Sequence, residues 1–141
     1  MNVKQKEFLY YLFMGANSYR MYNAEGIDDA AIVNEVYASA ISAGVITEKE
    51  INREAAVSRY QAIRFLIRYM GLGKLASDHS IFRVGFKDSA DIPKEYLGFV
   101  AIGKSMQIIG GSNGRFNGSL SLTNGDAAKI IYKTLKKAGE Y

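Results

Sequence analysis

Few residues in this chain could do covalent or metal chemistry. The sequence has no cysteine, so thiolate catalysis and thiolate metal sites are excluded. Its single histidine, His79, lies in a polar connector without a second histidine nearby, which favours a surface position over a metal ligand or a triad base. The acidic pairs Asp28 with Asp29 and Asp88 with Asp91 could form a glycosidase dyad or a calcium loop, but capping of the following helices explains them more simply. We therefore expect no enzymatic activity, no metal and no cofactor.

A glycine-rich loop is the other candidate for chemistry. In Gly110-Gly111-Ser112-Asn113-Gly114, backbone amides could face an anion. Gly-Gly and Asn-Gly are also common turn sequences, and a turn is the favoured interpretation. The Lys and Ser or Thr that would complete a nucleotide-binding P-loop do not follow.

Composition limits the class of protein. With 141 residues, 48% of them hydrophobic, the chain is long enough to bury a core as one compact domain. The formal net charge of +4 favours an acidic partner such as an anionic polysaccharide, a nucleic acid or a membrane surface. The basic residues are scattered and match no nucleic-acid-binding motif, so no nucleic acid is expected. The sequence as given contains no apolar run long enough for membrane insertion and no signal-peptide pattern.

The elements that would position these residues are helices. Apolar periodicity and glycine stops predict helices at residues 3–14, 28–43, 58–70, 93–106 and 124–137. Propensity alone would also allow one long helix over residues 48–70. Comparison of the chain with itself predicts a break near Ala56 instead, leaving a short helical turn at residues 48–53.

That comparison rests on a repeated helix start. An apolar residue is followed by Ser or Thr and then, three positions later, by Gln or Asp, which is the pattern of a capping box. The copies are Val57-Ser58-Arg59-Tyr60-Gln61, Leu122-Thr123-Asn124-Gly125-Asp126 and, with Lys4 replacing the hydroxyl residue, Val3-Lys4-Gln5-Lys6-Glu7. The intervals are 54 residues (3 to 57) and 65 residues (57 to 122), and Ile51 and Phe116 each stand six residues before a copy. The pattern predicts an irregular helix-loop-helix repeat.

Residues 86–135 resemble an S-layer homology repeat. The resemblance is carried by Phe86-Lys87-Asp88, Gln107-Ile108-Ile109-Gly110-Gly111, Gly114-Arg115-Phe116 and Leu122-Thr123-Asn124-Gly125-Asp126-Ala127-Ala128. Residues 22–72 match less well, and residues 3–14 look like the final helix of a preceding repeat. The resemblance implies an all-α, pseudo-threefold helical bundle whose first repeat is incomplete. On this basis residues 1–141 form one domain: 1–20 the second helix of a partial repeat, 21–75 a repeat, 76–85 a linker and 86–138 a repeat.

The resemblance also implies a function. S-layer homology domains are non-catalytic and attach secreted proteins to the bacterial cell wall by binding acidic secondary cell-wall polysaccharide. In the family an arginine after the helix cap serves the binding groove; the matching positions here are Arg59, Gln5 and Asn124. A planar guanidinium beside backbone amides suits a carboxylate on the glycan. The expected glycan-binding residues are Arg59, Ser58, Gln61, Gly110, Gly111, Thr123 and Asn124.

Two alternatives remain open. Arg59 could be a solvated first-turn residue or an ion-pair partner of Glu54. The chain could also be a protein-interaction or assembly module that keeps the fold without binding glycan. Its surface toward another chain or a second copy would then be the tyrosine-rich N-terminal quarter with Tyr10, Tyr11, Tyr19 and Tyr22.

Overall fold

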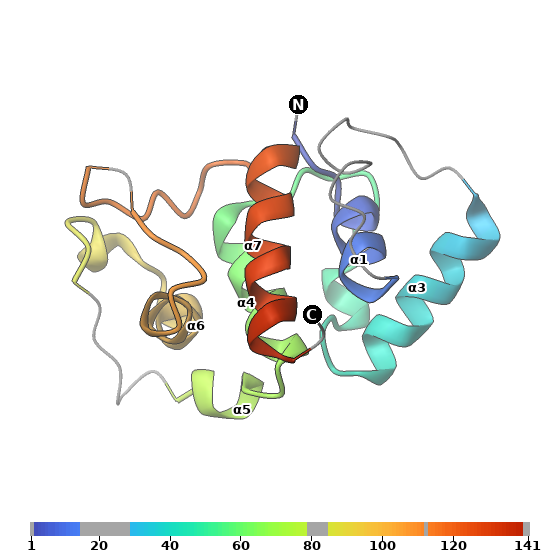
Figure 1. Ribbon diagram of the computed structural model, residues 1–141, viewed down its shortest axis with the longest axis horizontal. Coiled ribbons are helices and arrows are strands. Elements are labelled where there is room, and N and C mark those ends of the chain that lie inside the picture. Colours follow the sequence, from blue (N-terminus) through green and yellow to red (C-terminus); the bar gives the residue numbers. More distant parts are fainter. Residues whose placement is uncertain (1, 15–28, 79–84, 112, 140–141) are drawn as a thin grey trace. The chain divides into compact units, whose positions relative to one another are not determined.

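The protein is all-α, as the sequence predicts. The computed structural model describes residues 2–14, 29–78, 85–111 and 113–139, and in these ranges it has six α-helices and no β-strand. The elements, in chain order, are α1 (Gln5–Phe13), α3 (Ala30–Ser42), η1 (Glu48–Glu50), α4 (Arg59–Tyr69), α5 (Gly73–Ala76), η3 (Ser89–Asp91), α6 (Lys94–Ser105) and α7 (Asn124–Lys137) (Figure 1). None of the described helices has the length and apolar character needed to cross a membrane.

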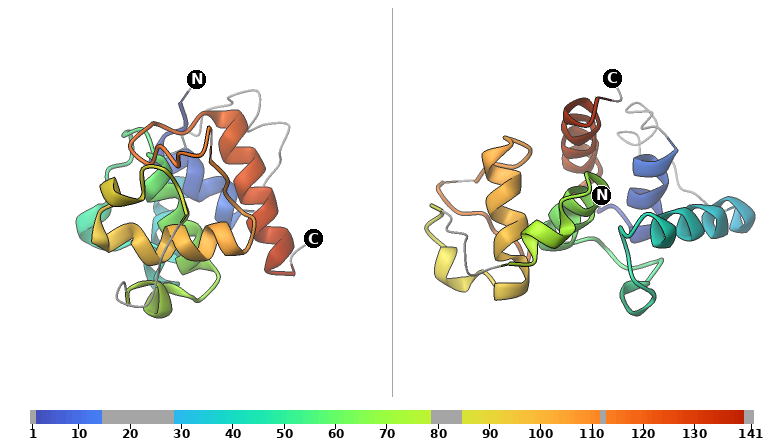
Figure 2. Two further views of the ribbon diagram at one scale, coloured as in Figure 1. Left: turned by 90° about the vertical axis from the view of Figure 1, so that its left-hand side faces the viewer. Right: turned by 90° about the horizontal axis from the view of Figure 1, so that it is seen from below.

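The chain divides into two compact units. The first unit comprises Met1–Val57 and Ser121–Tyr141, and the second comprises Ser58–Leu120. In the first unit α1 packs against α3 and α7; in the second, α4 packs against α6 while α5 contacts both (Figures 1 and 2). The division into repeats and the linker at residues 76–85 stay predictions.

The predicted helices are found with ends shifted by at most two residues. The break before residue 58 is confirmed as well, because η1 is a single 3-10 turn and α4 begins only at Arg59. The helix α5 was not predicted. It begins at Gly73 after Leu72, which makes no side-chain cap, so neither propensity nor capping signals it.

Capping explains several of the helix starts. The Ser58 hydroxyl accepts from the Gln61 N–H (3.2 Å), and the Gln61 side-chain oxygen accepts from the Ser58 N–H (3.0 Å), which completes the predicted box of α4. Asp29 caps α3 by accepting from the amides of Ala31 and Ile32. Its predicted companion Asp28 lies outside the described residues.

The other two copies of the capping pattern are each half complete. At α7 the Thr123 hydroxyl accepts from the Asp126 N–H (3.1 Å), but the predicted return bond from Asp126 is not formed. At α1 the Glu7 carboxylate accepts from the Lys4 N–H (2.9 Å), and the Lys4 ammonium has no lone pair with which to accept in turn. The sequence difference at Lys4 therefore removes one bond and keeps the other.

Each unit has its own apolar core. In the first unit Phe8, Leu9 and Leu12 of α1 are fully buried, together with Ile131 and Leu135 of α7. The second unit buries a corresponding set from α4, α6 and the following loop: Ile63, Leu66, Ile67, Phe99, Val100, Ile108 and Phe116. Each such side chain contributes about 1.5–3 kcal/mol through removal from water, which makes these stripes the main source of stability.

A closed ring of three backbone hydrogen bonds lies inside the first unit. The Val3 N–H donates to the Leu122 carbonyl oxygen (3.0 Å), the Val57 N–H to that of Val3 (3.0 Å), and the Leu122 N–H to that of Val57 (2.8 Å). All three residues are at most 1% exposed, so their amides need these partners. We call this arrangement the amide ring.

A pair of backbone bonds ties each of two helix starts to a loop far along the chain. The bonds run from Gln5 N to Ala55 O (2.9 Å) and Lys6 N to Arg53 O (3.1 Å) in the first unit, and from Arg59 N to Leu120 O (3.0 Å) and Tyr60 N to Gly118 O (3.0 Å) in the second. In both units the donors lie two and three residues after one apolar residue of the pattern, Val3 or Val57. The acceptors lie two and four residues before the next one, Val57 or Leu122.

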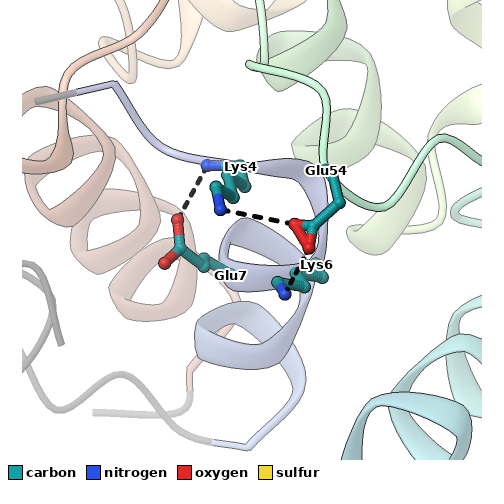
Figure 3. Close-up of polar contacts among 4 residues, drawn as sticks. All are labelled: Lys4, Lys6, Glu7 and Glu54. Carbon is teal, nitrogen blue, oxygen red and sulfur yellow. Dashed lines mark hydrogen bonds and ion pairs between the residues drawn. The ribbon is translucent and has the colours of Figure 1, made fainter. Parts of the chain in front are cut away.

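Ion pairs add to the tie in the first unit. Glu54 accepts from the Lys6 ammonium at 2.7 Å and pairs with Lys4 at 3.4 Å (Figure 3). The Lys6 hydrogen bond, with help from Lys4, lowers the pKa of Glu54. The Glu54 carboxylate is thus held by two lysines at the start of α1.

Gln5 is the polar centre of the first unit. Its buried side-chain oxygen accepts from the Tyr37 hydroxyl (2.7 Å) and the Asn52 N–H (2.8 Å), while its amide nitrogen donates to the Glu50 carbonyl (2.9 Å). Burial raises the pKa of Tyr37 to about 12, although Arg53 opposes the shift. One side chain thereby joins α1, α3 and the loop after η1.

Replacing Gln5 by leucine should destabilise the protein by about 2–4 kcal/mol, because the Tyr37 hydroxyl and the Asn52 amide would lose their acceptor inside the core. Urea unfolding followed by circular dichroism measures this change. Glu35→Leu, on the exposed side of α3, is the matched control that adds a leucine without orphaning a polar group. Equal unfolding midpoints for both variants would contradict the role given to Gln5.

Candidate functional site

Arg59 is held by the loop that it faces in the second unit. Its Nε donates to the Phe116 carbonyl oxygen (3.0 Å) and its Nη2 to the Gly110 carbonyl oxygen (3.1 Å). The guanidinium carbon lies 5.0 Å from the centre of the Phe116 ring. The planar fork thus binds two backbone carbonyls and covers an aromatic ring. Glu54, which the sequence offered as an ion-pair partner for Arg59, binds Lys4 and Lys6 within the first unit.

The predicted glycine loop lies next to Arg59, and the loop group that bonds to Arg59 is the carbonyl of Gly110. Gly110 is exposed and its oxygen accepts from Arg59. At Gly111 a Cβ atom would come within 2.7 Å of the Arg115 carbonyl oxygen and 2.8 Å of the Phe86 ring. Close packing therefore requires glycine at position 111.

The remaining predicted residues are split between the units. Ser58 and Gln61 form the capping box of α4 in the second unit, beside Arg59 in the chain. Thr123 caps α7 in the first unit, and Asn124, the first residue of that helix, is 8% exposed. The second unit thus brings together Arg59, Gly110 and Gly111, with the capping pair at the same helix start.

Asp88 does not cap a helix, so that prediction is wrong. Its buried carboxylate accepts from the Phe116 N–H (2.9 Å) and the Asn117 N–H (3.0 Å), and it makes no side-chain cap to η3. Burial would raise the pKa of Asp88, but these amide bonds outweigh it and the pKa is lowered. Asp88 braces the same loop whose carbonyls Arg59 binds.

A pocket of about 210 Å³ opens beside this loop. Its walls are Tyr60, Asp88, Asp91, Arg115, Asn117, Gly118, Ser119 and Leu120. The Tyr60 ring stacks on Tyr96, with centroids 4.8 Å apart and planes 11° from parallel. Gly118 lies so close to Tyr60 that a Cβ there would come within 2.1 Å of the ring. Tyr60 is therefore a fixed aromatic wall.

The pocket combines two carboxylates with one guanidinium. Burial, followed by the charges of Asp88 and Asp91, raises the pKa of Tyr60. Arg115, which is exposed, supplies the single positive charge of the lining. Such a lining suits sugar hydroxyls, which donate to carboxylates and accept from an arginine, better than it suits a ligand that brings a further carboxylate.

Sequence reasoning missed Tyr60, Asp88 and Asp91 as members of one pocket. The predicted repeat would place Tyr60 at the position of Lys6, and each of these two residues donates to a carbonyl four residues before the next apolar residue of the pattern, Val57 or Leu122. Asp88 and Asp91 have no such local signal. In the ranges that the structure describes, no three His, Asp or Glu side chains come together as a metal site, and His79 lies outside those ranges.

Compared with protein-family models, with curated proteins and with solved structures, the chain matches none of them.

Replacing Asp88 by asparagine should lower the stability at pH 7 by about 1–3 kcal/mol, because two amide bonds to a charged acceptor become bonds to a single neutral oxygen. The pKa of Asp88 is lower in the fold than its ordinary 3.8, so its stabilisation is present above pH 4 and is lost as the pH falls through the lowered pKa. Urea unfolding at pH 7, 5 and 3 should show a gap between wild type and variant that narrows at pH 3. The exposed Asp91→Asn is the control, and a gap that stays constant with pH would refute the role of the charge.

Arg59→Gln should cost about 1–3 kcal/mol, because the carbonyls of Phe116 and Gly110 lose a charged donor and the Phe116 ring loses its cover. Arg59→Lys should recover only part of this loss, since one ammonium cannot reproduce the planar fork. Thermal and urea unfolding measure both variants against Arg115→Gln, which removes an exposed arginine from the same unit. Wild-type stability of Arg59→Gln would overturn the structural role of Arg59.

Proposed function

We propose that this chain is a non-catalytic cell-envelope attachment domain of the S-layer homology type, which binds an acidic secondary cell-wall polysaccharide at the bacterial cell surface. The proposal joins the motif resemblance to the observations that follow. It includes the pseudo-threefold arrangement with an incomplete first repeat.

The observation that carries the proposal is the recurrence of the same long-range backbone bonds at the predicted repeat spacing. Val3, Val57 and Leu122 are the apolar residues before the three helix caps, and each donates to one of the others in the amide ring. Gln5 and Arg59, two residues further on, each bond to the residue two places before the following apolar position. A three-membered ring with such matched flanks is the local pattern expected around a pseudo-threefold axis.

The C-terminal ends of α3 and α6, the first helix of each predicted repeat, have matching backbone bonds. Val45 and Ile46 both donate to the Ala40 carbonyl (2.9 and 3.4 Å) after α3. Ile108 and Ile109 donate in the same way to the Gly103 carbonyl (3.0 and 3.4 Å) after α6. The intervening residues, Gly44 and Gln107, have positive φ angles of 75° and 61°. Two helix-loop-helix units with the same stop and the same start support a repeat.

The glycan contacts would combine the predicted residues with the pocket of the second unit. Gly110 and Gly111 are exposed, Arg59 fixes their loop, and Arg115 at the pocket lining can donate to sugar hydroxyls. Ser58 and Gln61 at the start of α4 are the further proposed contacts of the second unit, and Thr123 and Asn124 at the start of α7 are those of the first. Tyr60 would present an aromatic wall to a sugar ring.

A second function is favoured by a specific observation. Arg59, at the family's arginine position, binds the chain's own carbonyl groups, which is what a purely structural arginine does. A protein-interaction or assembly module with the same fold would need no more than this. The two proposals differ in whether the protein is retained by cell-wall polysaccharide.

Retention on purified cell-wall sacculi tests the choice. The wild-type protein should sediment with intact sacculi and remain in solution when the wall polysaccharide has been removed. Arg115→Gln and Arg59→Ala should both weaken retention severalfold, and the Arg115 variant should do so without loss of stability. Absence of wild-type retention would reject the anchor, and equal retention with and without the polysaccharide would favour a protein partner.

A further inference from the structure

One side of α7 gathers positive charge around a tyrosine. Lys129, Tyr132, Lys133 and Lys136 are all exposed, and Tyr132 keeps 43% of its surface. At about 100° per residue these four positions span an arc of roughly 100° on the helix. We call this surface the lysine face. The opposite side of α7 carries Ala127, Ile131 and Leu135 into the core.

The charges of the lysine face are not neutralised within the described part of the chain. No salt bridge there involves Lys129, Lys133 or Lys136. Asp126 is the single acidic residue of α7, against four lysines. The favourable effect of a cation at a helix C-terminus accounts for the last turn, with Lys136 and Lys137, but not for Lys129 and Lys133 further up.

The spacing of these charges suits a polymer. With a rise of about 1.5 Å per residue, the three lysine positions follow one another about every 4.5–6 Å along roughly 10 Å of helix. Three parallel point charges would meet anionic groups that recur along a chain, whereas a single small anion would use one of them. The partner with matching chemistry is therefore a polyanion.

Tyr132 favours a polyanion that contains sugar rings. Tyr132 lies at one edge of this arc and between Lys129 and Lys136 along the helix axis, where its ring can pack against the apolar C–H face of a sugar. The pocket of the second unit, with two carboxylates and one guanidinium, is poorly suited to an acidic group. An acidic glycan needs a cationic surface elsewhere on the chain, and α7 supplies one.

We infer that the lysine face of α7 is a contact surface for the carboxylate groups of an acidic polysaccharide, with Lys129, Lys133 and Lys136 pairing with carboxylates and Tyr132 packing on a sugar ring. The inference rests on the proposed function and assigns the acid recognition to a different surface from the pocket.

Binding of polygalacturonate, a carboxylated polysaccharide, tests the lysine face with the full chain. K129Q/K133Q/K136Q should bind about tenfold more weakly than wild type at low ionic strength, because each exposed ion pair contributes a factor of about 1.4 to 5. K49Q/K74Q/K94Q removes the same net charge from exposed positions outside α7 and should change affinity less than about twofold. Glutamine keeps helix propensity, and circular dichroism verifies that both variants are folded.

Three comparisons identify the chemistry of the partner. Fully methyl-esterified polygalacturonate should not bind, because its carboxylates are uncharged. Tyr132→Ala should weaken polygalacturonate binding severalfold and leave polyglutamate binding unchanged, since polyglutamate has no sugar ring. Equal loss in the two triple variants, equal binding of the esterified polymer, or tighter binding of duplex DNA than of polygalacturonate would each overturn the inference.

The two proposals fail separately. Wild-type retention on sacculi together with unchanged polygalacturonate affinity in K129Q/K133Q/K136Q would reject the lysine face alone. Loss of polygalacturonate affinity in that variant, with no wild-type retention on sacculi, would reject wall attachment and keep the lysine face.

Discussion

Three buried amides, those of Val3, Val57 and Leu122, bond to one another's carbonyl groups across long stretches of chain. Each belongs to the residue just before a helix cap, where no regular helix supplies a partner. An unpaired amide at such depth would cost about 1–3 kcal/mol, so the ring determines which segments meet. The starts of α1 and α7 follow from it, and with them the position of Gln5 and the bonds that it makes to α3 and the next loop.

Local patterns were sufficient for most of the fold. The helices α1, α3, α4, α6 and α7 have strong apolar stripes or recognisable caps, and the repeat correctly predicted that Thr47 and Glu50 begin only a single turn. The sequence does not predict α5, because a four-residue helix that starts at glycine has neither an apolar stripe nor a cap. The resemblance matches Gln5 to an arginine position, whereas in the fold Gln5 satisfies a buried network whose members stand 32 to 47 residues away.

The candidate site was predictable only in part, for a similar reason. Arg59 and Gly110 were named from the resemblance, and they are in contact. The direction of that contact, from guanidinium to carbonyl, depends on the backbone at Phe116 and Asn117, which Asp88 holds from almost thirty residues away. An acidic residue before a helix has the appearance of a cap in the sequence. In the fold, the Asp88 carboxylate instead accepts from the amides of Phe116 and Asn117.

The amide ring also has a consequence for the order of folding. Val57 can bond to Val3 as soon as the first half of the chain exists, but the other two bonds must wait for Leu122, which is made much later. Closing loops of this length has an entropic cost, and topologies dominated by distant contacts fold slowly. The helices can form early because their bonds are local. We therefore expect ring closure to follow helix formation, and until it occurs the backbone groups of Val3 are unpaired and open to other chains.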